Sequence, residues 1–221
     1  HSDKAIMLPT GFKNEMELIL EAGCALFGGM EAMAEKPRMI ALINTVSPLT
    51  LDERMLDCLM LLAKYGQAAV LCPATMLGAT GSLSMAGTIA SGTAEALAGI
   101  VLAQMIRPGT PVVFGIQSTA ADLRGGITFA CAAPEGTLMQ GFSANMGKFY
   151  GMPSRGGGCQ TDAPVINCQA GYESMLTFSS AYRHGINLVM EAGGVMDSVN
   201  ATSFEKMVID FEIMRQVKAS F

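Results

Sequence analysis

"QAAVLCPATMLGATGSLSMAGTIASGTAEALAGIVLAQMIRPGTPVVFGIQ", residues 67–117, is the stretch that decides the fold of this chain. It begins and ends with short apolar runs, 67–72 and 111–117, which are typical of strands buried on both faces. Between them we predict a loop rich in small residues and a helix over 85–106 that "RPG" terminates. Two buried strands joined by a helix predict a parallel sheet covered by helices.

The same alternation continues on both sides of this stretch. Thr50 with Glu53, and Thr202 with Glu205, have the spacing of capping boxes, in which two side chains satisfy free amides at a helix start. We therefore predict that one helix begins at each box. The remaining predicted elements are strands at 5–8, 39–45 and 187–193, a weak strand in the glycine-rich segment 153–163, and helices over 14–27, 136–149 and 169–182.

Two architectures fit six such units. A (β/α)8 barrel usually has about 250 residues, and six units of about 37 residues leave two units missing. The chain also starts without a methionine, at "HSDKAIML". We therefore expect residues 1–221 to form one incomplete barrel domain of a longer chain. An open doubly wound sheet, which the same elements would complete, is the alternative.

Composition narrows the function classes. Half of the residues are hydrophobic and 15% are charged, as in a globular protein. The net charge is −5 and the basic residues are scattered, so we expect no nucleic-acid partner. No apolar run reaches the ~18 residues of a membrane span, and no export signal opens the chain, so we expect a cytoplasmic protein without a membrane partner.

Cysteine and histidine spacing bears on metal sites. The six cysteines include no C-x-x-C pair, so we expect free thiols in a reducing cytoplasm. The two histidines do not complete a zinc-ligand pattern, and we expect no bound metal.

The carboxyl ends of the strands are where both architectures place function. "RGGGCQTD", residues 155–162, lies at one predicted end, and its glycine run matches neither phosphate-binding motif. Glu191 lies in the apolar "LVMEAGG", where an unpaired buried carboxylate is costly, so it should face the mouth of the fold or be paired. We expect the three glycines to form a bare wall that lets a ligand come close.

Four segments together resemble the trimethylamine methyltransferase family of corrinoid-dependent enzymes: "SPLTLDE", "AEALAGIVLAQMIRPGTPVVFG", "RGGGCQTDAPVINCQAGYES" and "IDFEIMR". The resemblance extends from about Lys36 to the C-terminus. It implies a (β/α)8 barrel that passes a methyl group from a methylated amine to the cobalt of a separate corrinoid protein. The trimethylamine-using members carry pyrrolysine, whereas every residue here is a standard one, which implies a quaternary amine such as glycine betaine.

Site residues follow from the resemblance and from the strand ends. Aromatic faces and acids bind a trimethylammonium group, and Arg155 or Gln160 would bind the carboxylate of a betaine. Gln169 and Glu173 share a helix face and would instead hold the preceding loop. The predicted site comprises the catalytic residues Glu191 and Asp162 and the substrate-binding residues Arg155, Gly157, Gly158, Gln160, Phe149, Tyr172, Gln117 and Asn44.

Two other functions remain open at this point. One is a barrel methyltransferase with a pterin methyl donor, and the other is an amine-binding protein of the same fold without activity. In each case we expect a homo-oligomer. For the corrinoid enzyme, the corrinoid is carried by the partner protein.

Overall fold

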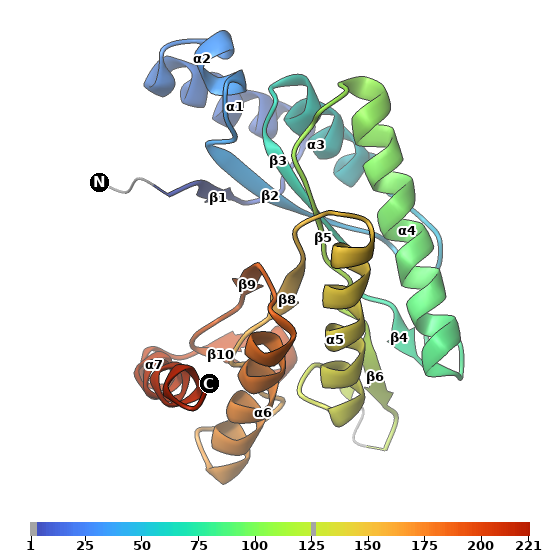
Figure 1. Ribbon diagram of the computed structural model, residues 1–221, viewed down its shortest axis with the longest axis vertical. Coiled ribbons are helices and arrows are strands. Elements are labelled where there is room, and N and C mark those ends of the chain that lie inside the picture. Colours follow the sequence, from blue (N-terminus) through green and yellow to red (C-terminus); the bar gives the residue numbers. More distant parts are fainter. Residues whose placement is uncertain (1–3, 125–126) are drawn as a thin grey trace.

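A computed structural model describes residues 4–124 and 127–221 of the chain. In these two ranges, helices alternate with strands that are mostly parallel (Figure 1). The helices are α1 (Lys13–Phe27), α2 (Met30–Ala34), α3 (Glu53–Lys64), α4 (Met85–Ile106), α5 (Pro134–Phe149), α6 (Cys168–His184) and α7 (Phe204–Ala219). The strands that alternate with them are β1 (Ile6–Leu8), β2 (Met39–Asn44), β3 (Ala68–Cys72), β5 (Val112–Phe114), β8 (Arg155–Gly157) and β9 (Leu188–Met190).

These six strands follow one another in chain order. A four-stranded parallel sheet has the order β1-β2-β3-β5, and β8 pairs with β9 in parallel. The two sheets meet where the Phe114 amide donates to the Pro153 carbonyl at 2.9 Å, beside a parallel bridge from Phe114 to Ser154. A doubly wound sheet requires a reversal of strand order, so that alternative does not match the observed order.

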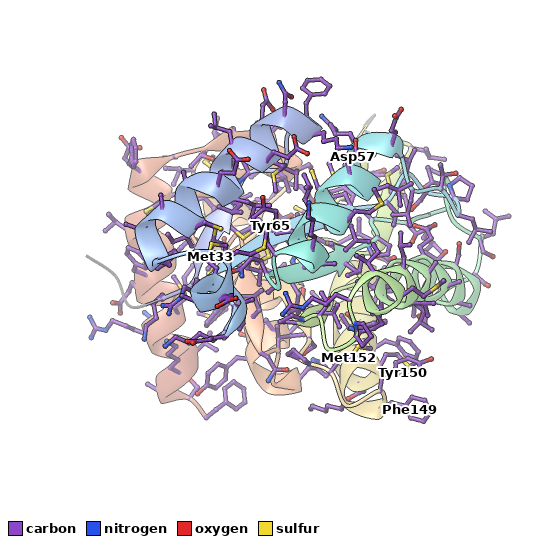
Figure 2. All side chains as sticks on the ribbon, turned by 90° about the horizontal axis from the view of Figure 1, so that it is seen from above. Met33, Asp57, Tyr65, Phe149, Tyr150 and Met152 are labelled. Atoms are coloured by element: carbon purple, nitrogen blue, oxygen red, sulfur yellow. The ribbon has the colours of Figure 1, made fainter. Side chains whose placement is uncertain are left out.

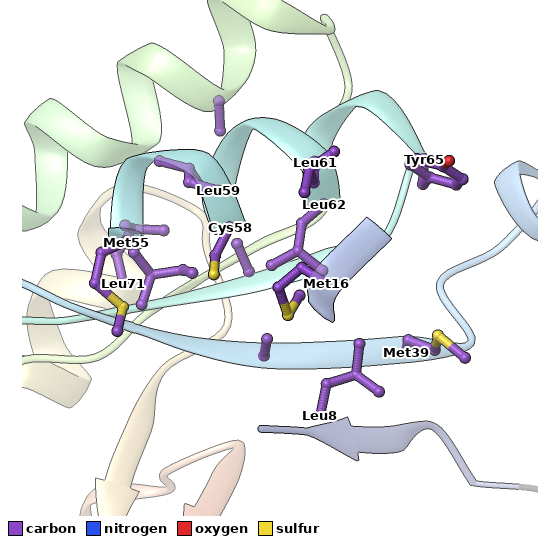
Figure 3. Packing of buried hydrophobic residues seen from close by; sticks show 14 of the residues in the cluster. Leu8, Met16, Met39, Met55, Cys58, Leu59, Leu61, Leu62, Tyr65 and Leu71 are labelled. Carbon is purple, nitrogen blue, oxygen red and sulfur yellow. The ribbon is translucent and has the colours of Figure 1, made fainter. Parts of the chain in front are cut away.

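The helix-facing side of the sheet carries the larger core. Ala41, Ile43, Leu71 and Phe114 are buried there among side chains of α1, α3 and α4. Figure 3 shows α3 lying over β2 and β3, with Leu59, Leu62 and other apolar side chains between them. Alternate strand residues point to opposite faces, which explains why Leu71 faces the helices and its neighbours do not.

The opposite side of the sheet is also apolar. Val70, Cys72 and Val113 form a second buried cluster, and Leu188 of β9 packs against it. Since β9 is the last of the six strands and Val70 lies in the third, the sheet curls strongly enough for its inner faces to meet. The near-continuous apolar strand sequences are explained by burial on both sides.

The two capping boxes were placed one or two residues too early. The side chain of Asp52 caps α3, because it accepts from the amide of the third helical residue at 2.7 Å. Thr50 instead donates to the Pro48 carbonyl at 3.1 Å. Ser203, and not Thr202, caps α7 in the same way. Each helix still begins within a few residues of the predicted start.

Several short elements were not predicted. β6 (Thr119–Asp122) and β7 (Ile127–Ala130) form an antiparallel pair after β5, and β4 (Met76–Leu77) pairs with β6. β10 (Val195–Met196) and β11 (Ala201–Thr202) form a second pair around the 3-10 turn η1 (Asp197–Val199), after β9. Both groups of short strands follow the carboxyl ends of the main parallel strands.

Among the described helices, α4 has the length and apolar composition of a possible membrane span. It packs on α3, β3 and α5, and it buries Glu95 in its middle. The core helix of a soluble protein passes the same test, so α4 is weak support for a membrane partner.

Candidate functional site at the carboxyl ends of the strands

Arg155 is the centre of a polar cluster near the carboxyl ends of β3, β5 and β9. It opens β8, and its side chain is fully buried. One guanidinium nitrogen donates to Gln117 after β5 and to the sulfur of Cys72, the latter at 3.3 Å. The other nitrogen forms an ion pair with Glu191 after β9. Residues from four strands are thus brought to one point, as the prediction for Arg155, Gln117 and Glu191 requires.

Gly115 creates the space for this arginine. A Cβ atom at Gly115 would lie 2.8 Å from the Cβ of Arg155. A glycine at the end of β5 therefore allows β8 to bring a long cationic side chain against it. Gly115 was not among the predicted site residues.

Glu191 is the part of the cluster that reaches the surface. Its side chain is 19% exposed, whereas that of Arg155 is fully buried. Its backbone φ is 46°, in the left-handed region that a residue with a side chain seldom adopts. Burial raises the pKa of the Glu191 carboxyl, and the charge of Arg155 counteracts part of that rise. Gln160 lies beside it, with 3.5 Å between its amide nitrogen and a Glu191 oxygen.

The three glycines of "RGGG" are packed against protein. A Cβ at Gly158 would lie 2.5 Å from the Cα of Ala192, a backbone atom that cannot move aside easily. The space beside Gly157 is filled by the Gln160 side chain, and Gly156 faces Gln140 at 3.1 Å. The expected bare wall for a ligand is therefore wrong, because neighbouring residues fill the space. Substrate binding by Gly157 and Gly158 stays a prediction.

Asp162 holds three segments together. Its Oδ1 accepts from the Cys131 amide at 2.9 Å and from the Ser198 hydroxyl at 2.8 Å, and its Oδ2 accepts from the Ala132 amide at 3.1 Å. Its carboxylate also contributes to the strongly raised pKa of the Cys131 thiol, after the larger effect of burial. Both oxygens accept hydrogen bonds, and the structure does not bring Asp162 to the Arg155 cluster. Its catalytic role stays a prediction.

Glu173 locks the loop that precedes its helix, which is the alternative that the sequence left open. Its Oε2 accepts from the Thr161 hydroxyl at 2.5 Å and from the Asp162 amide at 2.9 Å. Gln169, one turn earlier, donates to the other oxygen at 2.9 Å. These bonds fix residues 160–162, and with them the position of Gln160.

Three predicted substrate contacts lie away from the cluster. Phe149 ends α5, is 78% exposed and stacks edge-on against Tyr150, with 5.1 Å between ring centroids. Figure 2 shows it next to Tyr150 at the margin of the molecule. Tyr172 is 62% exposed on α6, and Asn44 is exposed at the end of β2. The structure does not join these three side chains to Glu191.

Glu95 is a buried acid that the sequence analysis missed. It accepts hydrogen bonds from the hydroxyls of Thr45 and Ser47 and from the Leu49 amide, the last at 2.7 Å. It therefore ties the loop after β2 to α4. An acid inside the small-residue run "TAEALAG" was the available signal, by the argument that selected Glu191.

An open cavity of about 590 Å³ lies between the β6–β7 pair and the N-terminal ends of α5 and α6, and its lining includes Asp162 but not Arg155 or Glu191. Asp162, Gln169 and Glu173 line one side of it, and Asp122 and Glu135 line the other. Within residues 4–124 and 127–221, no three His, Cys, Asp or Glu side chains are grouped to hold a metal ion.

Comparison with known proteins gives a consistent result. The family model described as trimethylamine methyltransferase (MTTB) matches residues 1–221. A glycine betaine methyltransferase of Desulfitobacterium hafniense is 43% identical over 96% of this chain and 44% of its own length. A proline betaine:corrinoid methyltransferase of Eubacterium limosum is 35% identical over 80% of this chain and 37% of its own. A trimethylamine methyltransferase MttB of Methanosarcina barkeri is 35% identical over 88% and 39%. The chain spans less than half the length of these relatives.

Proposed function

The chain belongs to the trimethylamine methyltransferase family, and we propose that it serves in transferring a methyl group from a quaternary amine of the glycine betaine kind to the cobalt of a corrinoid carried by a separate protein. The observation that carries this proposal is the 43% identity to a glycine betaine methyltransferase over nearly the whole chain. The trimethylamine methyltransferase named above is less similar, at 35% identity.

The proposed architecture is an incomplete (β/α)8 barrel formed by residues 1–221 as one domain. Six parallel strands in chain order, with helices on the outside, support it. The contact of Leu188 with the inner faces of β3 and β5 supports it as well, because only a curled sheet brings β9 there. Polar groups at the carboxyl ends would then line the mouth of the barrel.

The reaction requires little acid–base catalysis by the protein. The carbon–nitrogen bond breaks with its electron pair remaining on nitrogen, so a quaternary ammonium leaves as a neutral tertiary amine and takes up no proton. The corrinoid protein supplies the Co(I) nucleophile, which forms the new bond to the methyl carbon. The residues of this chain need only bind the cation, aim one methyl group outward and exclude water.

Glu191 is the proposed anchor for the ammonium group. Its side chain is partly exposed, the Gln160 amide lies beside it, and Gln117 contacts the same arginine. Arg155 lies behind Glu191 with no exposed surface, so a substrate meets the carboxylate first. We therefore assign Arg155 to orienting Glu191 and to keeping it ionised, and we give Gln160, which is 2% exposed, the same orienting role.

The test is a binding and turnover experiment on the full-length protein. Calorimetry compares glycine betaine with 3,3-dimethylbutanoate, which has the same shape and carboxylate but no positive charge. Methyl transfer to Co(I) corrinoid is then measured with each bound amine. We expect glycine betaine to bind, the analogue without the ammonium charge to bind at least about tenfold more weakly, and methyl transfer from glycine betaine to follow.

The alternatives give different results in the same experiment. Glycine betaine binding without methyl transfer would indicate an amine-binding protein. Transfer from methyltetrahydrofolate would indicate a pterin-dependent enzyme. Equal binding of glycine betaine and 3,3-dimethylbutanoate would contradict the role of Glu191.

We also propose a cytoplasmic homo-oligomer. All six cysteines are free, which suits a reducing compartment. Phe204, Val208 and Phe211 project from α7 with more than half of each side chain exposed, and such an apolar stripe suits a contact with a second copy. Sedimentation of the full-length protein measures the oligomeric state, and fractionation of cells measures its location.

A further inference from the structure

The last helix is charged on its buried side. Lys206 is 1% exposed and Asp210 is fully buried, and they form an ion pair across one turn of α7, with 2.7 Å between Nζ and Oδ2. Phe204 and Val208, on the opposite side, are exposed. Ile213 and Val217 are buried further along the same helix, so the charged pair adjoins an apolar core contact, where a helix that only covered a core would carry apolar residues instead.

The buried pair is bonded to both strand ends that form the site. Lys206 Nζ donates to the Cys159 carbonyl at 2.8 Å, and Cys159 directly precedes Gln160. Asp210 Oδ2 accepts from the Gly194 amide at 2.7 Å, and Gly194 follows Glu191 by three residues. One ion pair therefore joins the segment after β8 to the segment after β9.

The segment after β9 needs such support. Glu191 has a left-handed backbone, which is unfavourable for a residue with a side chain and persists only when its surroundings enforce it. The close approach of Gly158 to Ala192 holds one side of this segment, and the Gly194–Asp210 hydrogen bond holds the other.

Stability alone is a poor explanation for this pair. Two charges removed from water lose solvation that their attraction only partly returns, and well-packed apolar residues are often as stable in such places. One oxygen of Asp210, Oδ1, also has no hydrogen-bond partner among the described residues. What the ion pair supplies, and an apolar pair cannot, is one donor for Cys159 and one acceptor for Gly194.

We propose that Lys206 and Asp210 are positioning residues, which fix the geometry of Glu191 and Gln160 from behind without touching the substrate. The ligand-binding consequence rests on the proposed function. The consequence for Glu191 itself does not, because the ion pair would hold this residue whatever it binds.

The experiment compares two double variants of the full-length protein. Lys206→Met/Asp210→Leu removes charge, donor and acceptor, whereas Lys206→Gln/Asp210→Asn removes the charges and keeps a donor and an acceptor. The matched control, Glu212→Gln/Arg215→Gln, removes an exposed ion pair from the same helix. The readouts are thermal unfolding, hydrogen exchange of residues 191–194, the Glu191 pKa from carboxyl NMR, and glycine betaine affinity.

We expect the Met/Leu variant to remain folded while residues 191–194 exchange about tenfold faster. Its Glu191 pKa should shift, and its affinity for glycine betaine should fall about tenfold, since a loosened anchor no longer meets the cation in the required geometry. The Gln/Asn variant should recover most of each change, and the control should match the parent protein.

Other outcomes overturn the proposal. A folded Met/Leu variant with unchanged exchange, Glu191 pKa and affinity would show that the pair positions nothing. Failure of both double variants to fold would show that the pair is structural. If the parent protein itself does not bind glycine betaine, the proposed function is wrong, while exchange and the Glu191 titration still decide the present inference.

Discussion

Among the residues that the structure describes, two ion pairs have a buried cation, and they differ in what they join. Arg155 and Glu191 come from the ends of two adjacent strands, whereas Lys206 and Asp210 lie one turn apart on a single helix. The Glu191 side chain is 19% exposed and the Asp210 side chain is not exposed at all. A ligand can therefore reach the Arg155–Glu191 pair from the surface. The Lys206–Asp210 pair contacts only neighbouring protein groups.

This difference predicts where a substitution should affect function and where it should affect folding. Disruption of the enclosed pair leaves a charge with no access to water. Disruption of the Arg155–Glu191 pair leaves either a partly exposed carboxylate or a buried arginine, in each case at the proposed ligand site. The predictions below test this distinction, beginning with the largest effect.

Lys206→Met should reduce the free energy of unfolding by about 3–5 kcal/mol, because the Asp210 carboxylate remains buried without its countercharge. Urea denaturation of the variant and the parent protein measures the loss. A loss below about 1 kcal/mol would mean that water reaches Asp210 and that the two pairs are not different in kind.

Gly158→Ala should reduce stability by about 1–3 kcal/mol, since the new methyl group would lie 2.5 Å from the Ala192 backbone and would push the segment after β9 outward. Gly171→Ala is the matched control, because nothing lies within 4 Å of its added Cβ in α6. That control should be neutral or stabilising by up to about 1 kcal/mol. Equal effects at both positions would remove the argument for a tight approach at Gly158.

Glu191→Gln should weaken glycine betaine binding about tenfold at neutral pH, because the cation loses its countercharge. In the parent protein the affinity should rise with pH as Glu191 ionises, through a midpoint above the ordinary glutamate pKa, because burial raises the pKa of this group. The variant should lack this step. Calorimetry from pH 4 to pH 8 measures both, and a parent affinity that does not change with pH would contradict the anchor role.

The same group should affect stability with the opposite slope. A carboxyl whose pKa is raised in the folded state favours folding when protonated, so its contribution is complete below the ordinary glutamate pKa and is lost as pH rises through the raised value. The difference in unfolding free energy between the parent and Glu191→Gln, measured against pH, isolates this contribution from that of other carboxylates.

Glu212→Gln/Arg215→Gln should change the unfolding free energy by less than about 0.5 kcal/mol, because both partners of this pair are largely exposed and water screens their attraction. Urea denaturation checks this baseline. A larger loss would mean that charge on α7 matters for reasons other than burial.

Local pattern was sufficient to place the main elements. The predicted helix 85–106 coincides with α4, and the predicted strands each overlap a parallel strand, because apolar periodicity and helix-ending residues act over a few neighbours. The caps were misplaced because each helix start offers two capping residues, Thr50 and Asp52 or Thr202 and Ser203, and backbone geometry selects between them.

The candidate site was predicted only in part. Arg155, Gln117, Gln160 and Glu191 were selected as strand-end polar residues, and they do meet. Phe149 was selected because it lies near the motif in sequence. It is the last residue of α5, which ends just before β8 begins, so it lies away from the carboxyl ends of the strands. Glu95 and Lys206 passed unnoticed because each lies in a helix, where a single charge usually faces water.

The sequence by itself determined which segments are strands and helices, which strand ends carry polar side chains, and which family the chain resembles, since these are properties of short, contiguous patterns. Only the tertiary structure decided which of those polar groups meet, and that the glycines of "RGGG" accommodate protein neighbours. It also decided that a helix charged on its buried face joins two strand ends. The physical reason is that a buried charge is tolerated only beside a partner, and partners from different strands and helices become neighbours only when the chain folds.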